Sequence, residues 1–454
     1  MNSRVEGSGL AKAAAILASG TIIAQGSLVL ALPLLTRIYS PNDFSVLATY
    51  ASILAIFSGI ACLRFEVAIP QPDSDDEALS LLRLSLIAPF LLSLVAFIVI
   101  FFMQTGTFAG RKLPVIDGYA WLLPIGILVV GWYAAISYWF LRLKRYADVS
   151  INKVWQSISS VLVQLGVGLF LIGPFGLILG HLASGGAGVI GLIIKLRRSA
   201  IRVFAPISGQ RLRDTFYKYR DFPRYSVPES LANNLNIQLP IILIAAWSVG
   251  PEVGFLALAS RVIQAPVALI GGALSQVYSS RASEEHRAGE LAEFTAKILE
   301  GLIRTGVGPL IFIGLISSKI FPIVFGAEWS RAGDIVFWMT PWIVMQFLAS
   351  PISLALHITS RQKVALIIQL IGLMVRVGAV LIAAYFSKQN LVNAYAGSGF
   401  LFYLIYFAAV LLCVGVKLRR VADMFLKNWL IVSGWVVAAL LIDRGLMFVP
   451  SRLS

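Results

Sequence analysis

Long apolar runs separated by short polar segments repeat along the whole chain. A helix that crosses a bilayer needs about 20 mainly apolar residues. Twelve runs of this length are uninterrupted by charge pairs. Another run, near 428–449, is interrupted by Asp443 and Arg444, so the sequence leaves open whether it forms a thirteenth span. The pattern predicts an all-α polytopic membrane protein with 12, or with this run 13, transmembrane helices. The twelve uninterrupted runs lie near residues 13–36, 44–63, 79–103, 118–141, 152–172, 174–195, 225–248, 252–278, 301–321, 334–358, 364–386 and 391–416.

The composition agrees with a membrane protein and excludes several other classes. The chain has 454 residues, of which 58% are hydrophobic and 13% are charged. Soluble domains carry about 25% charged residues. The net charge of +15 does not indicate a nucleic-acid partner, because most of the charge lies in short loops on one side of the predicted membrane. Cys62 and Cys413 lie in apolar runs and form neither a metal-ligand spacing nor a disulfide framework.

The positions of Lys and Arg predict the orientation. Cytoplasmic loops of membrane proteins carry an excess of these residues. With the N-terminus inside, the inner segments hold 25 Lys and Arg and the outer segments hold 8. We therefore expect a cytoplasmic N-terminus. The longest outer loop, Gln104 to Asp117, is too short for a soluble catalytic domain.

A basic segment divides the chain into two halves. Residues 195–224 contain nine Lys and Arg and two acids. Within it, residues 208–222 mix apolar and basic positions, which predicts an amphipathic helix on the inner membrane surface. A solvated basic linker is the alternative. The predicted domains are an N-terminal six-helix bundle (1–198), this cytoplasmic hinge (199–224), a C-terminal six-helix bundle (225–417) and a tail with a possible extra span (418–454).

The two halves carry traces of an internal repeat. Pro41 and Pro251 begin matching turns that lead into the second span of each half. The inner loops 73–85 and 283–297 each place acids before an apolar run, where acids are favoured by the helix dipole. Halves that enter the membrane from the same side predict a parallel pseudo-repeat.

An Asp-x-Asp pattern lies in the first of these loops, in the run DSDDE at 73–77. A glycosyltransferase could use such a pair to hold a metal and a sugar nucleotide. The other interpretation is a helix N-terminus in water, with Ser74 and Glu77 forming a capping box. The short inner loop favours the helix N-terminus.

Two arginines lie within predicted spans. Ionisable groups inside the bilayer are costly and usually face a cavity or a partner. Arg376 falls near the middle of the run 364–386, and Arg261 lies in the outer half of the run 252–278. Both are candidates for a cationic cavity that binds substrate. A structural role, with hydrogen bonds to backbone carbonyls or to an acid, is the alternative.

Other candidate binding residues lie at helix ends or in a polar strip. Arg37, Arg64 and Glu66 lie at the ends of predicted spans, where long side chains can also reach water along the apolar surface. Asn233 and Asn234 lie in the inner half of the run 225–248. Their amides suit sugar hydroxyls, and they equally suit hydrogen bonds between helices.

Several stretches together resemble the polysaccharide-export flippases, the O-antigen and capsule repeat-unit transporters of the multidrug/oligosaccharidyl-lipid/polysaccharide (MOP) exporter superfamily. They cover both halves of the chain in the expected order. The stretches are residues 30–50, 63–85, 219–240, 249–283 and 325–363. Members of such families carry an acid deep in the first span, whereas Ala13 to Thr36 contains none.

The resemblance implies two six-helix bundles around a central cavity and transport of an undecaprenyl-diphosphate-linked oligosaccharide across the bacterial inner membrane. Arginines of the cavity, Arg37, Arg64, Arg261 and Arg376, would then bind the diphosphate, because paired N–H donors match phosphate oxygens. No cofactor is expected, and H⁺ or Na⁺ is the candidate coupling ion. The implied partners are membrane lipids and the polymerase and chain-length regulator of the same pathway.

Two other functions remain as alternatives. A drug or small-cation exporter of the same superfamily would need acids in its cavity, whereas the deep charges here are arginines. A polysaccharide polymerase or ligase would need a large outer loop with catalytic residues. We therefore expect a transporter and not an enzyme.

Overall fold

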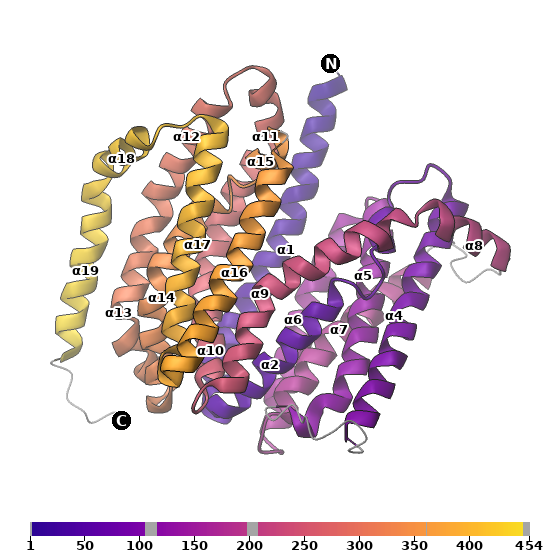
Figure 1. Cartoon of the computed structure of the whole chain (residues 1–454), viewed down its shortest axis with the longest axis horizontal. Helices are drawn as coiled ribbons and strands as arrows, with labels where there is room; N and C mark the ends of the chain where they lie inside the picture. Colours follow the sequence, from indigo (N-terminus) through magenta and orange to yellow (C-terminus); the bar gives the residue numbers. More distant parts are fainter. Residues whose placement is uncertain (1, 105–115, 198–207, 360, 448–454) are drawn as a thin grey trace. The chain divides into compact units, whose positions relative to one another are not determined.

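The computed structural model describes residues 2–104, 116–197, 208–359 and 361–447 (Figure 1). All regular structure in these ranges is helical. The chain forms two compact units: unit 1 comprises residues 1–31 and 45–246, and unit 2 comprises residues 32–44 and 247–454. The predicted domain boundaries stay a prediction. Parts of the predicted hinge (199–207), outer loop (105–115) and tail (448–454) lie outside the described residues.

Unit 1 contains most of α1 and the helices up to α9. The helix α1 continues past Ala31 into unit 2, and Pro33 follows this junction. A 3₁₀ turn at Asp117–Leu122 leads into α5, and a π turn at Phe222–Ser226 leads into α9. The helices are α1 (Asn2–Ile38), α2 (Pro41–Ser58), α3 (Phe65–Ala68), α4 (Asp75–Gln104), α5 (Leu123–Arg142), α6 (Tyr146–Gly168), α7 (Phe175–Arg197), α8 (Gly209–Lys218) and α9 (Val227–Trp247).

Unit 2 contains the remaining helices. Short 3₁₀ turns precede two of them, at Ala327–Trp329 and Lys388–Asn390. The helices are α10 (Glu252–Pro266), α11 (Gly272–Arg287), α12 (Leu291–Leu302), α13 (Gly308–Phe325), α14 (Ser330–Ala349), α15 (Ala355–Ile358), α16 (Gln362–Phe386), α17 (Leu391–Val414), α18 (Leu418–Lys427) and α19 (Trp429–Met447).

The predicted apolar runs all coincide with helices. Among the described residues, nine helices are long and apolar enough to cross a membrane, or ten if the bent pair α18–α19 forms one span. The runs predicted at 44–63, 152–172 and 225–248 form α2, α6 and α9, which are shorter or more polar than these nine. The protein is therefore an all-helical, polytopic membrane protein with nine or ten candidate spans.

Two spans of unit 2 are built from helix pairs joined by π turns. Val267–Gly271 joins α10 to α11, and Ile303–Val307 joins α12 to α13. Phe347 of α14 packs against both turns, because a Cβ atom on Gly271 or Gly306 would lie 3.4 Å or 2.1 Å from its ring. Single π turns inside helices often mark functional sites. Phe347 is 1% exposed and fills the space that the two glycines leave.

The helix α19 explains the charges that interrupt the last apolar run. It packs along α13 (Figure 1), and Lys319 of α13 forms an ion pair with Asp443 at 2.7 Å. Trp435 lies over Gly308, where a Cβ atom would be only 2.3 Å from the indole Cδ1. The carboxylate of Asp443 is thus matched by a lysine, as a charge near a helix end in the bilayer requires.

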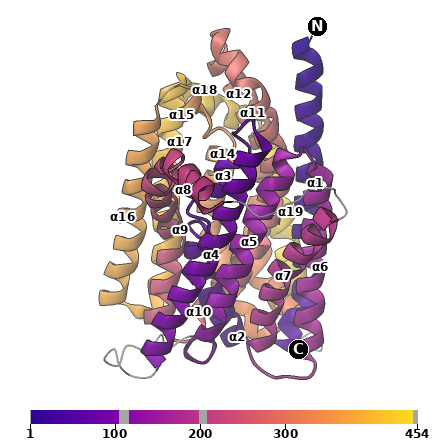
Figure 2. The ribbon, with the colours of Figure 1, turned by 90° about the vertical axis from the view of Figure 1, so that its right-hand side faces the viewer.

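The predicted amphipathic helix of the basic segment forms as α8, near the start of α4 (Figure 2). Ser208 caps it by accepting a hydrogen bond from the Arg211 amide at 3.3 Å. The Arg211 guanidinium pairs with Asp76 at 2.9 Å, and Lys218 pairs with Glu77. Two basic side chains of α8 therefore face the acids that begin α4.

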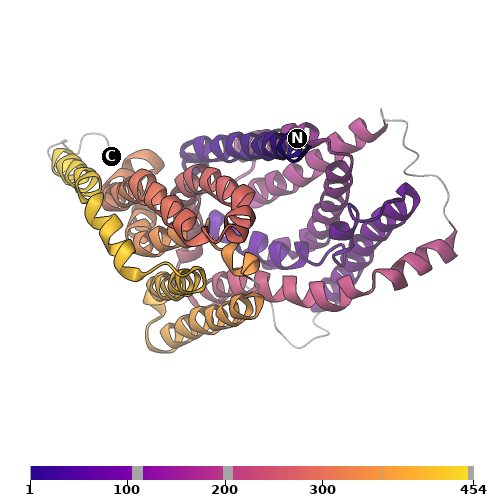
Figure 3. The ribbon, with the colours of Figure 1, turned by 90° about the horizontal axis from the view of Figure 1, so that it is seen from above.

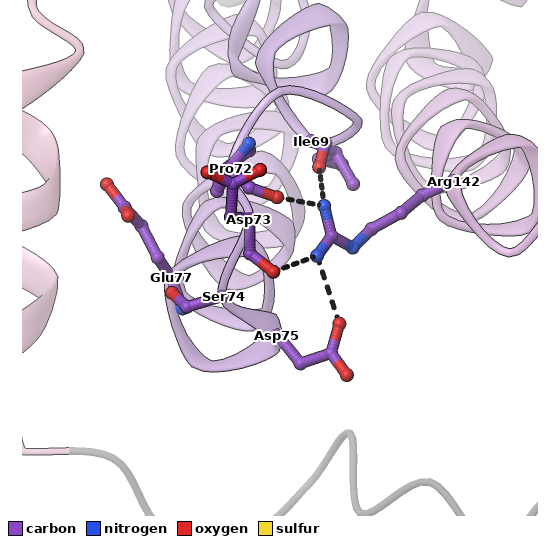
Figure 4. A network of polar contacts seen from close by, with 7 residues as sticks. All are labelled: Ile69, Pro72, Asp73, Ser74, Asp75, Glu77 and Arg142. Carbon is purple, nitrogen blue, oxygen red and sulfur yellow. Dashed lines mark hydrogen bonds and ion pairs between the residues drawn. The ribbon is translucent and has the colours of Figure 1, made fainter.

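A second arginine anchors the other side of the DSDDE run (Figure 4). The Arg142 side chain, 12% exposed, pairs with Asp75 at 3.0 Å and donates to the carbonyl oxygen of Pro72 at 2.5 Å. Longer hydrogen bonds of 3.4 Å reach the carbonyl oxygens of Ile69 and Asp73. The run therefore serves as a helix N-terminus, and its acids Asp75, Asp76 and Glu77 are paired with basic side chains. The helix N-terminus interpretation fits, and the capping bond from the Glu77 amide to Ser74 Oγ measures 3.3 Å.

Unit 2 has a similar arrangement along α12 (Leu291–Leu302). The short helix α18, seen lengthwise in Figure 3, follows α17 and meets α19 at 57°. Arg420 of α18 pairs with Glu293 at 2.5 Å, and Lys427 pairs with Glu300 at 2.7 Å. In both units, a basic ten-residue helix that precedes the unit's last helix is paired with acids of an earlier helix.

We expect Arg142→Ala to lower the thermal stability of the purified protein strongly. The substitution removes a nearly buried group whose hydrogen bonds are worth about 1.5–3 kcal/mol each. Arg211→Ala is the matched control, because an exposed ion pair contributes only about 0–1 kcal/mol. The measurement is the midpoint of thermal unfolding in detergent. Equal midpoints for the two variants would contradict the proposed anchoring role of Arg142.

Candidate functional site

Two of the predicted arginines, Arg37 and Arg261, border one aromatic cluster in unit 2. Trp329 is fully buried and packs edge-on against Phe44, with ring centroids 4.9 Å apart. Its Nε1 donates a hydrogen bond to the carbonyl oxygen of Thr36 at 3.2 Å. Arg37 follows Thr36 at the end of α1, and the Arg261 Cζ lies 6.0 Å from the Phe44 ring centroid. We name Arg37, Phe44, Arg261 and Trp329 the Trp329 cluster. It brings together two arginines that are far apart in the sequence.

Both arginines are exposed and have spare hydrogen-bond donors. Arg37 Nη2 donates to the carbonyl oxygen of Ile323 at 3.3 Å. Neither Arg37 nor Arg261 forms an ion pair with a residue that the structure describes. The neighbouring acid Glu252 is occupied by Arg331, at 3.1 Å and 3.3 Å. Two exposed guanidinium groups without carboxylate partners suit an oxyanion ligand.

Arg64 and Glu66 form a second predicted group, in unit 1. The chain turns sharply there, since Leu63 and Arg64 have φ values of 53° and 64°. The Arg64 Nη1 lies 3.5 Å from Glu66 Oε1. Within the described chain, Arg64 Nε and Glu66 Oε2 are buried and have no hydrogen-bond partner. This pair is therefore incompletely satisfied and leaves one acceptor and one donor for another group.

The surroundings of Glu66 favour its neutral form. Its carboxyl is 6% exposed, and burial raises the pKa of Glu66 above its ordinary value. A backbone hydrogen bond and the positive charge of Arg64 act in the opposite direction and reduce this shift of the pKa. Glu66 is a buried acid of the short helix α3, and it can exchange a proton nearer to neutral pH than an exposed glutamate.

The predicted asparagines lie on α9 in unit 1. Asn234 packs over Gly59, where a Cβ atom would lie 1.9 Å from its Nδ2. Beside it, Ser230 Oγ donates to the carbonyl oxygen of Gly59 at 2.9 Å. Asn234 therefore contributes to helix packing, whereas Asn233 is exposed.

Arg376 lies apart from the other candidates of unit 2, in the middle of α16. It is 4% exposed, and its guanidinium lies over the ring of Phe402 at 4.5 Å. Reasoning from the sequence missed both aromatic groups, around Trp329 and around Arg376, because their members come from helices far apart along the chain. The tryptophans at 329 and 342 were the available signal.

The described fold is that of transporters of the MOP superfamily. The structure resembles the lipid II flippase MurJ in an inward closed conformation, with a TM-score of 0.72 and 13% identity over 95% of this chain and 96% of that chain. The structure also resembles a MATE family multidrug resistance transporter in an inward-facing conformation, with a TM-score of 0.60 and 15% identity over 89% of this chain and 98% of that chain. For a MOP superfamily transporter from Pyrococcus furiosus, the TM-score is 0.54 and the identity 13%, over 89% of this chain and 96% of that chain.

Residues 34–334 match the sequence profile of the family described as polysaccharide biosynthesis protein, and the chain belongs to this family. No curated protein matches the chain in sequence. The predicted family is therefore confirmed. The fold, shared with solved transporters, agrees with the predicted transporter.

We expect the stability of the protein to depend on pH through Glu66. A carboxyl whose pKa is raised in the folded state stabilises the fold at low pH, and this contribution is lost as pH rises through the raised pKa. Glu66→Gln removes this loss. The unfolding midpoint of the variant should therefore gain on that of the wild type as pH is raised from about 4.3, the ordinary glutamate pKa, towards neutral.

Arg64→Gln provides the companion measurement. Loss of the positive charge should raise the pKa of Glu66 further and move the decline in stability to higher pH. A constant difference between wild type and Glu66→Gln across this range would show that Glu66 is not perturbed by burial.

Proposed function

We propose that this protein is a flippase that moves undecaprenyl-diphosphate-linked oligosaccharide repeat units across the bacterial inner membrane. The product would be a surface polysaccharide such as O-antigen, capsule or exopolysaccharide. The family and the likeness to a lipid II flippase support this proposal. The observation that carries it is the pair of exposed arginines, Arg37 and Arg261, without carboxylate partners in the described chain.

The proposed roles follow from the chemistry of such a lipid. The guanidinium groups of Arg37 and Arg261 in unit 2 would bind the diphosphate, whose oxygens accept paired N–H donors. Arg64 in unit 1 is a separate candidate for contact with the same group. Asn233 would serve the glycan, while the lipid tail stays in the bilayer. Glu66 is the described acid best suited to carry a coupling proton, and Na⁺ remains the other candidate ion. Alternating access of two six-helix bundles, related by a parallel repeat, would move the head group across.

The proposed topology has 12 or 13 spans and a cytoplasmic N-terminus. The matched pairing of α8 with α4 and of α18 with α12 supports the parallel repeat. The close packing of α19 on α13 supports the thirteenth span, which would place the C-terminus outside. Polymerase and chain-length regulator of the same pathway are the proposed protein partners.

A cation-coupled exporter of drugs or small molecules is the second candidate. The likeness to a MATE family multidrug transporter favours it. A cationic drug would need a carboxylate to bind, whereas Arg37 and Arg261 of the Trp329 cluster are cations. The nature of the transported molecule therefore distinguishes the two candidates.

Deletion of the protein in its native host should cause lipid-linked oligosaccharide to accumulate in the inner leaflet. Expression of the wild-type chain should reverse this accumulation. The Arg261→Ala variant should insert normally and fail to reverse it, and Arg261→Lys should restore only part, because a point charge cannot reproduce the guanidinium fork. The measurement is the amount of lipid-linked oligosaccharide accessible from each side.

Arg281→Ala is the matched control, because Arg281 is an exposed arginine of the same unit that pairs with Glu285 at 2.8 Å. It should restore export fully. No accumulation on deletion, with increased sensitivity to cationic drugs instead, would favour the exporter. Full export by Arg261→Ala would remove this arginine from the site.

The topology can be tested by labelling single cysteines. In a variant without Cys62 and Cys413, a cysteine at Lys388 should react with an impermeant reagent from the periplasm. A cysteine at Arg287 should react only after the membrane is opened. Both positions are exposed, so accessibility through the membrane decides the result. The reverse pattern would overturn the orientation derived from the distribution of Lys and Arg.

A further inference from the structure

Arg376 lies in a box of aromatic rings inside unit 2. Its Cζ lies 4.5 Å from the Phe402 ring centroid, 5.5 Å from Tyr403 and 5.7 Å from Trp342. These residues come from α14, α16 and α17. We name Trp342, Arg376, Phe402 and Tyr403 the Arg376 box. Ring faces attract a cation, so they hold the guanidinium where water does not reach it.

Two glycines allow the rings to lie directly on the helix backbones. Gly372 precedes Arg376 by one helical turn, and a Cβ atom there would lie 2.4 Å from Phe402 Cε2. A Cβ atom on Gly399 would lie 2.5 Å from Trp342 Cδ2. Any larger residue at either position would displace a wall of the box. The geometry of the box therefore depends on glycine at both positions.

The hydrogen-bond donors of the box lack acceptors. Arg376 Nε, Arg376 Nη2 and Trp342 Nε1 are buried, and none has a partner among the described residues. Arg376 forms no ion pair in this part of the chain. Ring faces attract the positive charge but leave these N–H groups unsatisfied, and buried polar groups are normally paired. Three buried N–H groups of the box are therefore left without acceptors, and an anion with several acceptor oxygens would satisfy them.

We propose that the Arg376 box binds the diphosphate group of a polyprenyl lipid, in a conformation in which the rings have moved apart. This inference rests on the proposed function and assigns a second anion site, separate from the exposed arginines at the Trp329 cluster. A diphosphate fits because its oxygens can accept from the guanidinium and from the indole N–H together. While the anion is absent, the rings retain the guanidinium.

A purely structural role predicts a different response to substitution. Arg376 is a buried charge without a carboxylate, and apolar residues of similar size often replace buried charges without loss of stability. Arg376→Met should therefore unfold at the wild-type temperature or above it. A residue kept for packing would lower the midpoint when it is replaced. A residue kept for an anion would leave the midpoint unchanged and lose the ligand.

The test uses the purified full-length protein and farnesyl diphosphate as the probe. Farnesyl diphosphate should raise the unfolding midpoint of the wild type, and farnesol should not. Arg376→Met should bind the probe about tenfold more weakly or worse, as expected when a charged hydrogen-bond partner is lost. Inorganic pyrophosphate is a further arm, because an equal effect would identify free diphosphate rather than a lipid as the ligand and would overturn the lipid assignment.

Three variants make the result specific to the box. Arg304→Met replaces an exposed arginine of the same unit and should bind as the wild type does. Trp342→Phe keeps an aromatic ring and removes only the indole N–H, so it should weaken binding without a large loss of stability. Gly399→Ala should displace Trp342 and weaken binding as well.

The outcomes separate this inference from the proposed function. Unchanged affinity in Arg376→Met overturns the box as a diphosphate site and leaves the proposed function intact. If Arg376→Met does not fold, unchanged affinity in Arg376→Lys and in Trp342→Phe has the same meaning. A wild-type protein that does not respond to farnesyl diphosphate contradicts the polyprenyl substrate itself, and the box with it.

Discussion

An ionised side chain inside a bilayer must be compensated by neighbouring groups, and this constraint organises both units of the protein. The chain uses several kinds of compensation. Lys319 has the carboxylate of Asp443, Arg37 has the carbonyl oxygen of Ile323, and Arg376 has the faces of aromatic rings. Where a carboxylate is present, the pair joins two helices. Where none is present, the cation keeps donors that no described residue satisfies, and these positions are the candidates for function.

The same need for compensation explains why each unit pairs a basic helix with acids of an earlier helix. Three acids in the first turn of α4 and Glu293 in the first turn of α12 are favoured by the helix dipole. The basic helices α8 and α18 add a compensating charge through Arg211 and Arg420. Such exposed pairs add little stability individually. A basic helix paired with acids of an earlier helix is thus a feature that the two units share.

Much of the fold could be predicted because it depends on properties that are local in the sequence. Apolar runs gave the helices, and the amphipathic pattern at 208–222 gave α8. The sequence left the last span open because Asp443 and Arg444 interrupt it, and only packing on α13 supplies Lys319 as a partner. Lys319 lies in a different apolar run, and nothing in the sequence around it indicates that it pairs with Asp443.

The candidate site could be predicted only in part. Arg376 was evident as a charge in an apolar run, but the rings that surround it come from α14 and α17. No local pattern links Trp342 to Phe402. The Trp329 cluster was missed for the same reason, since it joins the end of α1 to a turn nearly three hundred residues later. The pairing of helices determines which residues meet in such clusters. The spacing of residues in a single sequence does not predict which helices pair.

The burial of Arg376 also limits the mechanism. Arg261 is exposed and can meet an anion in the present conformation, whereas Arg376 is 4% exposed. Rigid rotation of two bundles would leave the Arg376 box closed, because all of its walls belong to unit 2. Access to Arg376 therefore requires helices of unit 2 to move against one another. The π turns at Val267–Gly271 and Ile303–Val307, which share Phe347 as a common contact, interrupt the regular α-helices of unit 2, and helices bend at such interruptions.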